Sequence, residues 1–293
     1  MEKMKIRFII NPKSGATKKK HFVDLINSNI DSAKFRSEII FTNAPGHATT
    51  LAREAANNNY DMVIAVGGDG SVNETGIGLM GSQTALGIIP TGSGNGMARH
   101  LKIPIQFKKA VQLINNGKIE MIDTLTINDH FCIGTFGVGF DAHIAHLFAN
   151  AGKRGYSTYV KLVLTEFSKF KSLKFKIFVD KKHHEISSFL LTFANSSQFG
   201  NNAVIAPFAD VKDGIIDISI IKKFPFFAAP HIIYRMMNNA IHQSKYFDRL
   251  IGKEIIIENK SHLKVHIDGE PIILEGNISI KIKPLSLKVV VAN

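Results

Sequence analysis

Apolar and polar residues follow a regular block pattern over about the first 105 residues. Short apolar runs are separated by polar or glycine-rich loops and by segments with apolar residues at helical spacing, such as Phe22, Leu25, Ile26 and Ile30. Apolar strands separated by helices predict a parallel sheet whose two faces are covered. The expected strands are residues 5–10, 38–41, 62–66 and 85–89, and the expected helices are the Phe22–Ile30 segment, residues 46–58, and segments from about 72 and about 95.

The pattern changes after about residue 122, where many apolar strands occur without alternating helices. This predicts a mainly antiparallel β second domain, as a sheet or a sandwich. We expect an α/β first domain of residues 1–124 and a β-rich second domain of residues 125–279, with the tail of about 280–293 returning to the first domain. The expected strands are 173–179, 189–193, 215–221, 254–257, 263–267 and 278–282, with helices at 157–170 and 230–242.

Composition narrows the class of protein. A chain of 293 residues favours two domains, and its single cysteine, Cys132, rules out an internal disulfide and fits a reducing cytoplasm. The N-terminal apolar run is too short for a signal peptide, and no transmembrane span is expected. The formal net charge of +12 can attract nucleic acid, anionic lipid headgroups or phosphorylated substrates. No zinc-finger spacing or aromatic RNA-binding signature occurs, so we expect no nucleic acid partner.

Three loops carry the candidate chemistry. They are NPKSG (11–15), GGDGSVNE (67–74) and PTGSGNGMAR (90–99), which follow the first, third and fourth expected strands. Ligands of such sheets bind at the carboxyl ends of the strands, and glycines let main-chain N–H groups approach an anion at a helix N-terminus. The loops therefore predict a nucleotide site, although neither a Walker P-loop nor a clean GxGxxG is present. Taken singly, each loop is also compatible with an ordinary turn.

Asp69 lies in the middle of the second loop. A carboxylate beside bound phosphates would repel them unless a divalent cation offset the charge, and Mg²⁺ prefers carboxylate and phosphate oxygens. The loop therefore predicts Mg²⁺ together with the nucleotide.

These motifs resemble those of the diacylglycerol kinase catalytic-domain superfamily, which includes bacterial lipid kinases, sphingosine kinases and ceramide kinases. The resemblance runs nearly end to end, through NPKSG, Thr42 with Gly46-His47-Ala48, GGDGSVNE, PTGSGNGMAR and His266-Ile-Asp-Gly-Glu-Pro271. Ser71 replaces the usual threonine. Gly96 stands where many bacterial diacylglycerol kinases have aspartate, so GSGNG is nearer to the sphingosine and ceramide kinase version.

The resemblance implies a first domain like that of NAD kinase and phosphofructokinase, with ATP and Mg²⁺ as cofactors. It carries nucleotide binding over to the residues of the matching motifs. These are Asn11, Pro12, Lys13, Ser14, Gly15, Thr42, Gly67, Gly68, Asp69, Gly70, Ser71, Asn73, Glu74, Thr91, Gly92, Ser93 and Asn95.

Candidate catalytic acids occur in both domains. Asp268 and Glu270 lie two residues apart, so in an extended strand both would point to one face, whereas Asp-Gly also favours a hairpin turn. In resembling kinases this glutamate is the base that deprotonates the lipid hydroxyl, with the aspartate supporting it or the metal. In the sphingosine kinase branch the GGDG aspartate has that role. The catalytic candidates are therefore Glu270, Asp268 and, as the rival base, Asp69.

A second metal site is implied by the segment Asp210-Val-Lys-Asp213-Gly-Ile215. Its spacing is that of an ordinary turn. Some bacterial members of the resembling family hold Mg²⁺ at this spacing, through two aspartates and a main-chain carbonyl. That carries over to Asp210, Asp213 and Ile215, as a structural or regulatory site.

The expected activity is transfer of the γ-phosphoryl of ATP to the hydroxyl of a lipid such as diacylglycerol, a sphingoid base or ceramide. The alternatives are a soluble-metabolite kinase of the NAD kinase type and a non-catalytic nucleotide- or lipid-binding regulator. The expected partner is a lipid at a membrane surface, met by a cytoplasmic protein that sits on the inner face of the membrane. The segments 131–148 and 189–199 are candidates for an acyl-chain slot, with core packing as the alternative. The particular lipid and the oligomeric state stay open.

Overall fold

The computed structural model describes residues 2–14, 19–151 and 156–293; Gly15, expected to bind nucleotide, lies outside them. The chain divides into two compact units, one of Met1–Asp123 with Pro284–Asn293 and one of Thr124–Lys283. It passes between the units within strands β5 (Lys118–Ile127) and β16 (Ile278–Val291).

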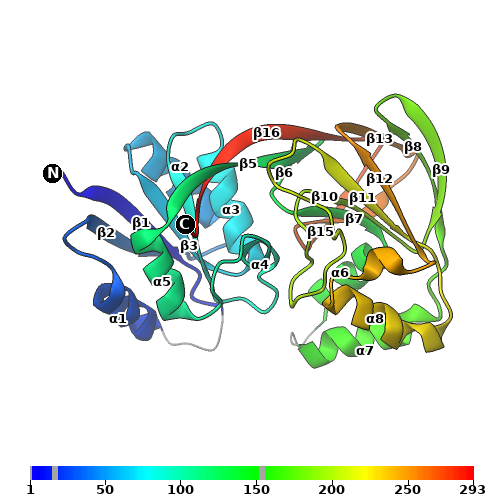
Figure 1. The fold of residues 1–293 in the computed structure, drawn as a ribbon, viewed down its shortest axis with the longest axis horizontal. Helices are drawn as coiled ribbons and strands as arrows, with labels where there is room; N and C mark the ends of the chain where they lie inside the picture. The colour runs from blue at the N-terminus through cyan, green and yellow to red at the C-terminus, as the bar shows by residue number, and fades with distance from the viewer. Residues whose placement is uncertain (1, 15–18, 152–155) are drawn as a thin grey trace. The chain divides into compact units, whose positions relative to one another are not determined.

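A parallel sheet forms the centre of the first unit, with the strand order β2-β1-β3-β4-β16 (Figure 1). Strands β3 and β4 are buried along their whole length because helices cover the sheet. The rings of Phe22 and Phe107 stack at 5.6 Å between α1 and α5, and α2 packs against α3. The elements are β1 (Met4–Ile10), α1 (Lys19–Asn29), β2 (Phe35–Phe41), α2 (His47–Asn57), β3 (Met62–Gly67), α3 (Asp69–Leu79), β4 (Ala85–Pro90), α4 (Gly96–His100) and α5 (Phe107–Asn116).

The expected strands and helices of the first unit are confirmed, with two differences. Strand β2 starts at Phe35 rather than at residue 38. It is an edge strand, and the exposed polar residues Arg36 and Ser37 near its start interrupt the apolar pattern from which the strand was predicted. The helix expected from about 95 ends at His100, where Lys102 adopts a left-handed backbone (φ 56°), and α5 is a separate helix.

One buried arginine ties this sheet to its helices. Arg7 of β1 is 4% exposed and donates from Nε to Glu38 of β2 (2.6 Å) and from Nη1 to the carbonyl of Leu51 in α2 (2.9 Å). Burial alone would raise the pKa of Glu38, but the hydrogen bonds from Tyr60 and Arg7 outweigh it, so the pKa lies below its ordinary value. The positive charge of the buried Arg7 is therefore compensated by the ionised Glu38, as a buried ion requires.

Two sheets share a core in the second unit. One has six strands in the order β12-β11-β10-β7-β14-β15, with all neighbours antiparallel. In the other, β13 pairs antiparallel with the start of β16 and with β8, which pairs with β9. Buried side chains of both sheets, such as Phe136, Ile218 and Ile255, form one cluster. The strands are β6 (His130–Cys132), β7 (Thr135–Gly139), β8 (Leu173–Val179), β9 (Lys182–Ser188), β10 (Leu190–Ala194), β11 (Ile216–Ile221), β12 (Phe247–Gly252), β13 (Glu254–Glu258), β14 (Leu263–Ile267) and β15 (Glu270–Leu274).

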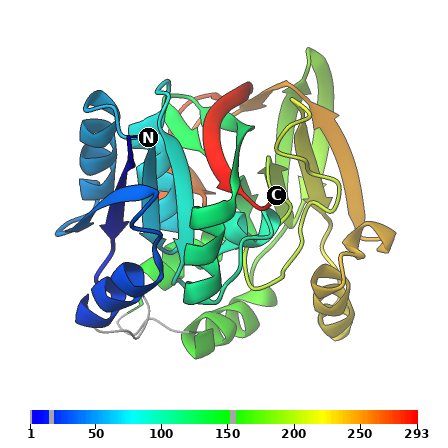
Figure 2. The same cartoon turned by 60° about the vertical axis from the view of Figure 1, so that its left-hand side comes forward.

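Three helices cover a second, aromatic core of this unit (Figure 1, Figure 2). They are α6 (Phe140–Ala149), α7 (Tyr156–Phe167) and α8 (Ala229–Met237), with the short turns η1 (Phe226–Ala228) and η2 (Ile241–Gln243) beside α8. Phe140 stacks on Phe189 at 4.5 Å, and Phe167 packs edge-on against Phe189 at 5.2 Å. Core packing therefore accounts for aromatic residues of the segments considered as an acyl-chain slot.

The predicted mixture of a parallel α/β unit and an antiparallel β unit is confirmed. The helix expected over 230–242 is wrong beyond Met237, because Asn239 has a left-handed backbone (φ 55°) and the chain turns before η2. Strands β5, β6, β7, β9 and β12 were not expected. Within the part of the chain that the structure describes, no helix is long and apolar enough to cross a membrane.

Candidate functional site

The three glycine-containing loops of the first unit lie against one another at the carboxyl ends of its strands. Strands β1, β3 and β4 are neighbours in the sheet, so the loops that leave them start side by side. Asn11 donates from Nδ2 to Oγ of Ser71 (3.3 Å), and the hydroxyl oxygens of Ser14 and Thr91 are 2.8 Å apart and hydrogen-bonded. The fold therefore gathers the three loops into one region.

Glycine is required where the second and third loops touch. A Cβ on Gly92 would lie 2.5 Å from Cα of Gly68, and a Cβ on Gly67 would lie 2.2 Å from Oγ of Ser71. Gly68 has φ −95°, a value open to any residue. Close contacts, with the Gly68 backbone at Gly92 and with the Ser71 side chain at Gly67, are thus the physical reason for these glycines, and a left-handed turn is not.

Asp69 bridges the second loop to the third. It is the first residue of α3, and its carboxylate accepts the main-chain N–H groups of Asn95 (2.9 Å) and Gly96 (2.7 Å). Asn95 is 4% exposed, has a left-handed backbone (φ 55°) and pairs with both the N–H and the carbonyl of Gly92. The carboxylate of Asp69 therefore holds the third loop in shape.

Two of the expected nucleotide residues contact strand or helix ends instead of the loops. Thr42 follows β2, and its main-chain N–H donates to the carbonyl oxygen of Ile10 at the end of β1 (2.9 Å). Glu74 accepts the N–H of Ala48 (3.2 Å), so its carboxylate caps the first turn of α2. The other residues expected to bind nucleotide lie in or next to the three loops. Pro12 and Lys13 are in the first loop, Gly70 and Asn73 are in the first turns of α3, and Ser93 is in the third loop.

In the second unit, Asp268 and Gly269 form the two-residue turn between β14 and β15. Both have positive φ (48° and 86°), and Ile267 pairs with Glu270 across the turn. This is the hairpin that Asp-Gly favours. The extended conformation that would place Asp268 and Glu270 on one face does not occur.

Asp268 holds the turn between β6 and β7. Its carboxylate accepts the main-chain N–H groups of Ile133 (2.8 Å), Gly134 (2.8 Å) and Thr135 (2.9 Å). The thiol of Cys132 lies 3.5 Å from the same carboxylate, and burial, aided by that negative charge, raises the pKa of the Cys132 thiol well above its ordinary value. In the structure Asp268 is thus a positioning residue that ties the β14–β15 hairpin to the turn between β6 and β7.

Replacing Asp268 with asparagine should destabilise the second unit by about 2–3 kcal/mol, because an amide cannot accept all three N–H groups. Urea unfolding would measure the change. The matched control is Asp129→Asn, at an exposed turn residue in the same unit, which should stay within about 0.5 kcal/mol of the parent. Equal stabilities of the two variants would show that the three hydrogen bonds make no net contribution to the free energy of unfolding.

Glu270 is placed differently. It is the first residue of β15 and is exposed, and among the residues that the structure describes its carboxylate has no hydrogen-bond or ion-pair partner. A carboxylate in this state has both oxygens available to a substrate hydroxyl.

A buried His–Asp pair behind this turn was not anticipated. Nε2 of His266 lies 2.9 Å from Oδ2 of Asp141, and the two side chains are 5% and 10% exposed. The N–H of Gly269 donates to Nδ1 of the same ring (3.4 Å), so the histidine connects Asp141 to the turn that precedes Glu270. Glycine at 137 makes room for the pair, since a Cβ there would lie 2.2 Å from Nε2. The motif HIDGEP contains the histidine but gives no sign of its distant partner.

Asp210 and Asp213 lie on the exposed turn before β11. Oδ1 of Asp210 accepts the N–H of Lys212 (3.0 Å), and Oδ1 of Asp213 accepts the N–H of Ile215 (2.9 Å). No group of three or more His, Cys, Asp or Glu side chains suited to a metal occurs among the described residues. A cation here would therefore need main-chain oxygen as well as the two carboxylates.

Two-domain kinases form a class in which an α/β unit with glycine-containing loops at the ends of its strands is joined to a β unit of two sheets. Comparison with known proteins places the chain in this class. The model of the diacylglycerol kinase catalytic domain matches residues 5–127, and that of the YegS C-terminal NAD kinase beta sandwich-like domain matches residues 134–291. The chain belongs to the diacylglycerol kinase catalytic-domain family, as its motifs indicated.

Individual relatives agree. The chain is 32% identical over 225 residues to the diacylglycerol kinase of Bacillus subtilis, covering 74% of this chain and 73% of that protein. It is 28% identical over 232 residues to a YegS-like probable lipid kinase of Chromohalobacter salexigens, covering 77% and 75%. A crystal structure of a diacylglycerol kinase from Bacillus anthracis superposes with a TM-score of 0.76 at 21% identity, over 99% of this chain and 98% of that one, which establishes the fold.

Proposed function

We propose that this protein is an ATP-dependent lipid kinase that transfers the γ-phosphoryl of ATP to a lipid hydroxyl, of the diacylglycerol or sphingoid and ceramide kind. The observation that carries the proposal is the family match across both units. The gathering of the three loops in the first unit supports it. The proposal includes a cytoplasmic protein that works on the inner face of the membrane.

The loops fit a nucleotide. Helix α3 begins at Asp69, beside the point where the second and third loops meet. The first N–H groups of a helix have no partner within the helix and favour an anion. The residues proposed to hold ATP are those of the three loops, with Ser14, Ser71 and Thr91 supplying hydroxyls and Lys13 a positive charge. ATP supplies the phosphoryl group, and Mg²⁺ offsets the charge of its phosphates.

We assign the proton acceptor to Glu270. Its carboxylate is exposed and has no hydrogen-bond or ion-pair partner among the described residues, whereas those of Asp69 and Asp268 accept main-chain N–H groups. Glu270 would take the proton of the lipid hydroxyl through one of its carboxylate oxygens. Asp69 and Asp268 would act as positioning residues, one for the nucleotide loops and one for the hairpin that carries Glu270.

We also propose a second Mg²⁺ site formed by Asp210, Asp213 and the main-chain carbonyl of Ile215. In the absence of nucleotide, excess Mg²⁺ should raise the melting temperature of the protein, and Asp210→Asn should reduce that rise. An identical Mg²⁺ response of the parent and the variant in thermal unfolding would exclude the site.

One experiment tests the function without choosing the lipid in advance. The purified protein is incubated with labelled ATP and Mg²⁺, either with a total lipid extract or with NAD, and labelled products are identified by mass. A phosphorylated lipid supports the proposal. The match of the second unit to a NAD kinase-like domain justifies the NAD arm, and labelling of NAD alone would establish the soluble-metabolite alternative. No product in either arm would favour a regulator.

A further inference from the structure

The position of Glu270, the proposed proton acceptor, depends on its backbone. Among the residues that the structure describes, its carboxylate has no hydrogen-bond or ion-pair partner that could orient it. Glu270 begins β15, which is the outermost strand of the six-stranded sheet and pairs with β14 on its inner side. An edge strand opens more easily than a strand with neighbours on both sides. The contacts that hold the β14–β15 hairpin therefore also fix the carboxylate of Glu270.

Helix α6 makes one such contact through the buried His–Asp pair. Asp141 lies in the first turn of α6, and its Oδ2 is 2.9 Å from Nε2 of His266 in β14. The other ring nitrogen, Nδ1, accepts the main-chain N–H of Gly269 (3.4 Å), in the turn directly before Glu270. The side chains of Asp141 and His266 are 10% and 5% exposed, and hydrogen bonds shielded from water in this way are electrostatically stronger. The turn is thus connected to the start of α6 through the ring of one histidine.

A second histidine, His146 of the same helix, binds the hairpin two residue pairs further from the turn. Its Nε2 lies 3.2 Å from the carbonyl oxygen of Val265 in β14 and 3.0 Å from that of Ile272 in β15. A carbonyl oxygen can only accept a hydrogen bond, so this nitrogen donates to both. Val265 and Ile272 are directly opposite each other in the hairpin. His146 therefore joins the two strands to each other as well as to α6.

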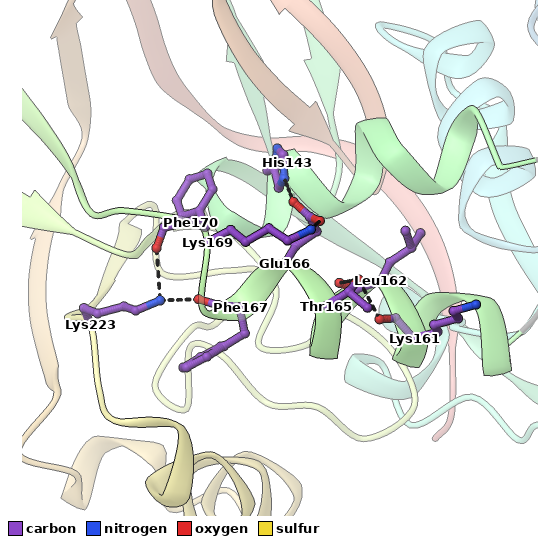
Figure 3. Close-up of polar contacts among 9 residues, drawn as sticks. All are labelled: His143, Lys161, Leu162, Thr165, Glu166, Phe167, Lys169, Phe170 and Lys223. Carbon is purple, nitrogen blue, oxygen red and sulfur yellow. Dashed lines mark hydrogen bonds and ion pairs between the residues drawn. The ribbon is translucent and has the colours of Figure 1, made fainter.

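A third polar side chain of α6, that of His143, has a different partner. Its Nε2 lies 3.0 Å from Oε2 of Glu166 in α7, as Figure 3 shows, and its ring packs against that of Phe170. His143 thus contacts α7, whereas Asp141 and His146 contact the hairpin. One helix therefore carries both the contacts that hold the hairpin and, next to them, a histidine contact that does not involve it.

We propose that Asp141, His266 and His146 are positioning residues for Glu270 in the phosphoryl-transfer reaction. They act through the backbone of the β14–β15 hairpin, which they hold to α6 at two points, one at the turn and one across the two strands. A displacement of about 1 Å at a reacting group can lower a rate about a hundredfold, so small movements of this hairpin are sufficient to matter. The proposal rests on the proposed lipid kinase function and on the assignment of the proton acceptor to Glu270.

Two substitutions break one contact each and keep the approximate size of the side chain. His266→Gln retains an amide that can reach Asp141 but has no acceptor in the place of Nδ1 for the N–H of Gly269, and His146→Phe lacks the donor for the two carbonyls. Each should lower kcat for lipid phosphorylation about tenfold and leave KM for ATP unchanged, because the loops proposed to hold ATP belong to the first unit. His146→Gln, whose NH₂ can donate to both carbonyls, should stay within about twofold of the parent kcat.

His143→Phe is the matched control, since it removes the same kind of side chain from the same helix and breaks the contact to α7. Its kcat should equal that of the parent. His266→Gln and His146→Phe are then repeated in a Glu270→Gln background. Residues that act through Glu270 have no proton acceptor left to position there, so each change should lower the residual rate less than about twofold. A further loss of about tenfold in that background would indicate a general structural effect and overturn the proposal. Full kcat in both single variants would overturn it too.

Hydrogen exchange followed by mass spectrometry measures the same contacts without the reaction. The main-chain amides of β15 should exchange about tenfold faster in His146→Phe than in the parent, while those of β10 in the same sheet should exchange at the parent rate. Equal exchange of β15 in the two proteins would contradict the proposal. Failure of the proposed function shows separately, as the absence of any phosphorylated lipid from the parent, and the exchange rates then still decide whether His146 holds the hairpin.

Discussion

Replacing Glu270 with glutamine is expected to lower kcat for lipid phosphorylation about a hundred- to ten-thousandfold, the range in which positioned proton acceptors contribute. Glutamine keeps the size of the side chain and cannot accept the proton. Glu270 is exposed and has no hydrogen-bond or ion-pair partner among the described residues, so the change should leave the free energy of unfolding within about 0.5 kcal/mol of the parent. Steady-state kinetics, with nucleotide affinity measured separately by calorimetry, would show a loss in kcat alone.

The control for this variant is Glu275→Gln at the other end of the same hairpin, where the carboxylate pairs with His262 at 2.7 Å and both side chains are exposed. Its kcat should equal that of the parent. A Glu270→Gln protein with full turnover would remove Glu270 from the mechanism and return the role of base to Asp69.

Replacing Asp69 with asparagine is expected to weaken nucleotide binding about ten- to a hundredfold, corresponding to about 1.4–2.8 kcal/mol. An asparagine has one acceptor oxygen for the two N–H groups of Asn95 and Gly96, and its own NH₂ would face the second of them. The third loop would then lose the shape that brings Gly92 against Gly68. Calorimetric titration with ATP in the absence of lipid measures the loss.

Asp61→Asn is the matched control in the same unit, because Asp61 accepts the N–H of Lys5 (2.7 Å) away from the loops. It should cost stability and leave the Kd for ATP unchanged. If Asp69→Asn bound ATP as tightly as the parent but turned over slowly, Asp69 would be acting on the reacting groups and not on the loops.

The parts of the fold that depend on neighbouring residues could be predicted from the sequence. The alternation of apolar runs and helices predicts the parallel sheet because each βα step is local, and the loops that follow β1, β3 and β4 are located by their glycines. The Asp-Gly turn at 268–269 is equally local, and its hairpin was one of the two geometries considered.

What the sequence could not show depends on contacts between distant segments. In the sequence Asp268 looks like a catalytic acid next to Glu270. In the structure its carboxylate binds the main-chain N–H groups of residues 133–135, which lie 133 or more residues away along the chain. The pairing of His266 with Asp141 spans 125 residues. The sequence suggests that Gly68 and Gly92 face a ligand, whereas in the structure the two glycines pack against each other. In each case the motif marks an important position and tertiary packing decides what it does.

Strand β16 has a practical consequence for anyone who wishes to study the units apart. Its last residues complete the sheet of the first unit, where Val289 pairs with Leu86, while its first residues pair with β13 in the second. A fragment that stops at 123 would leave the edge of β4 open to pairing with other chains. An autonomous version of that unit needs residues 284–293 spliced back by a linker or by circular permutation.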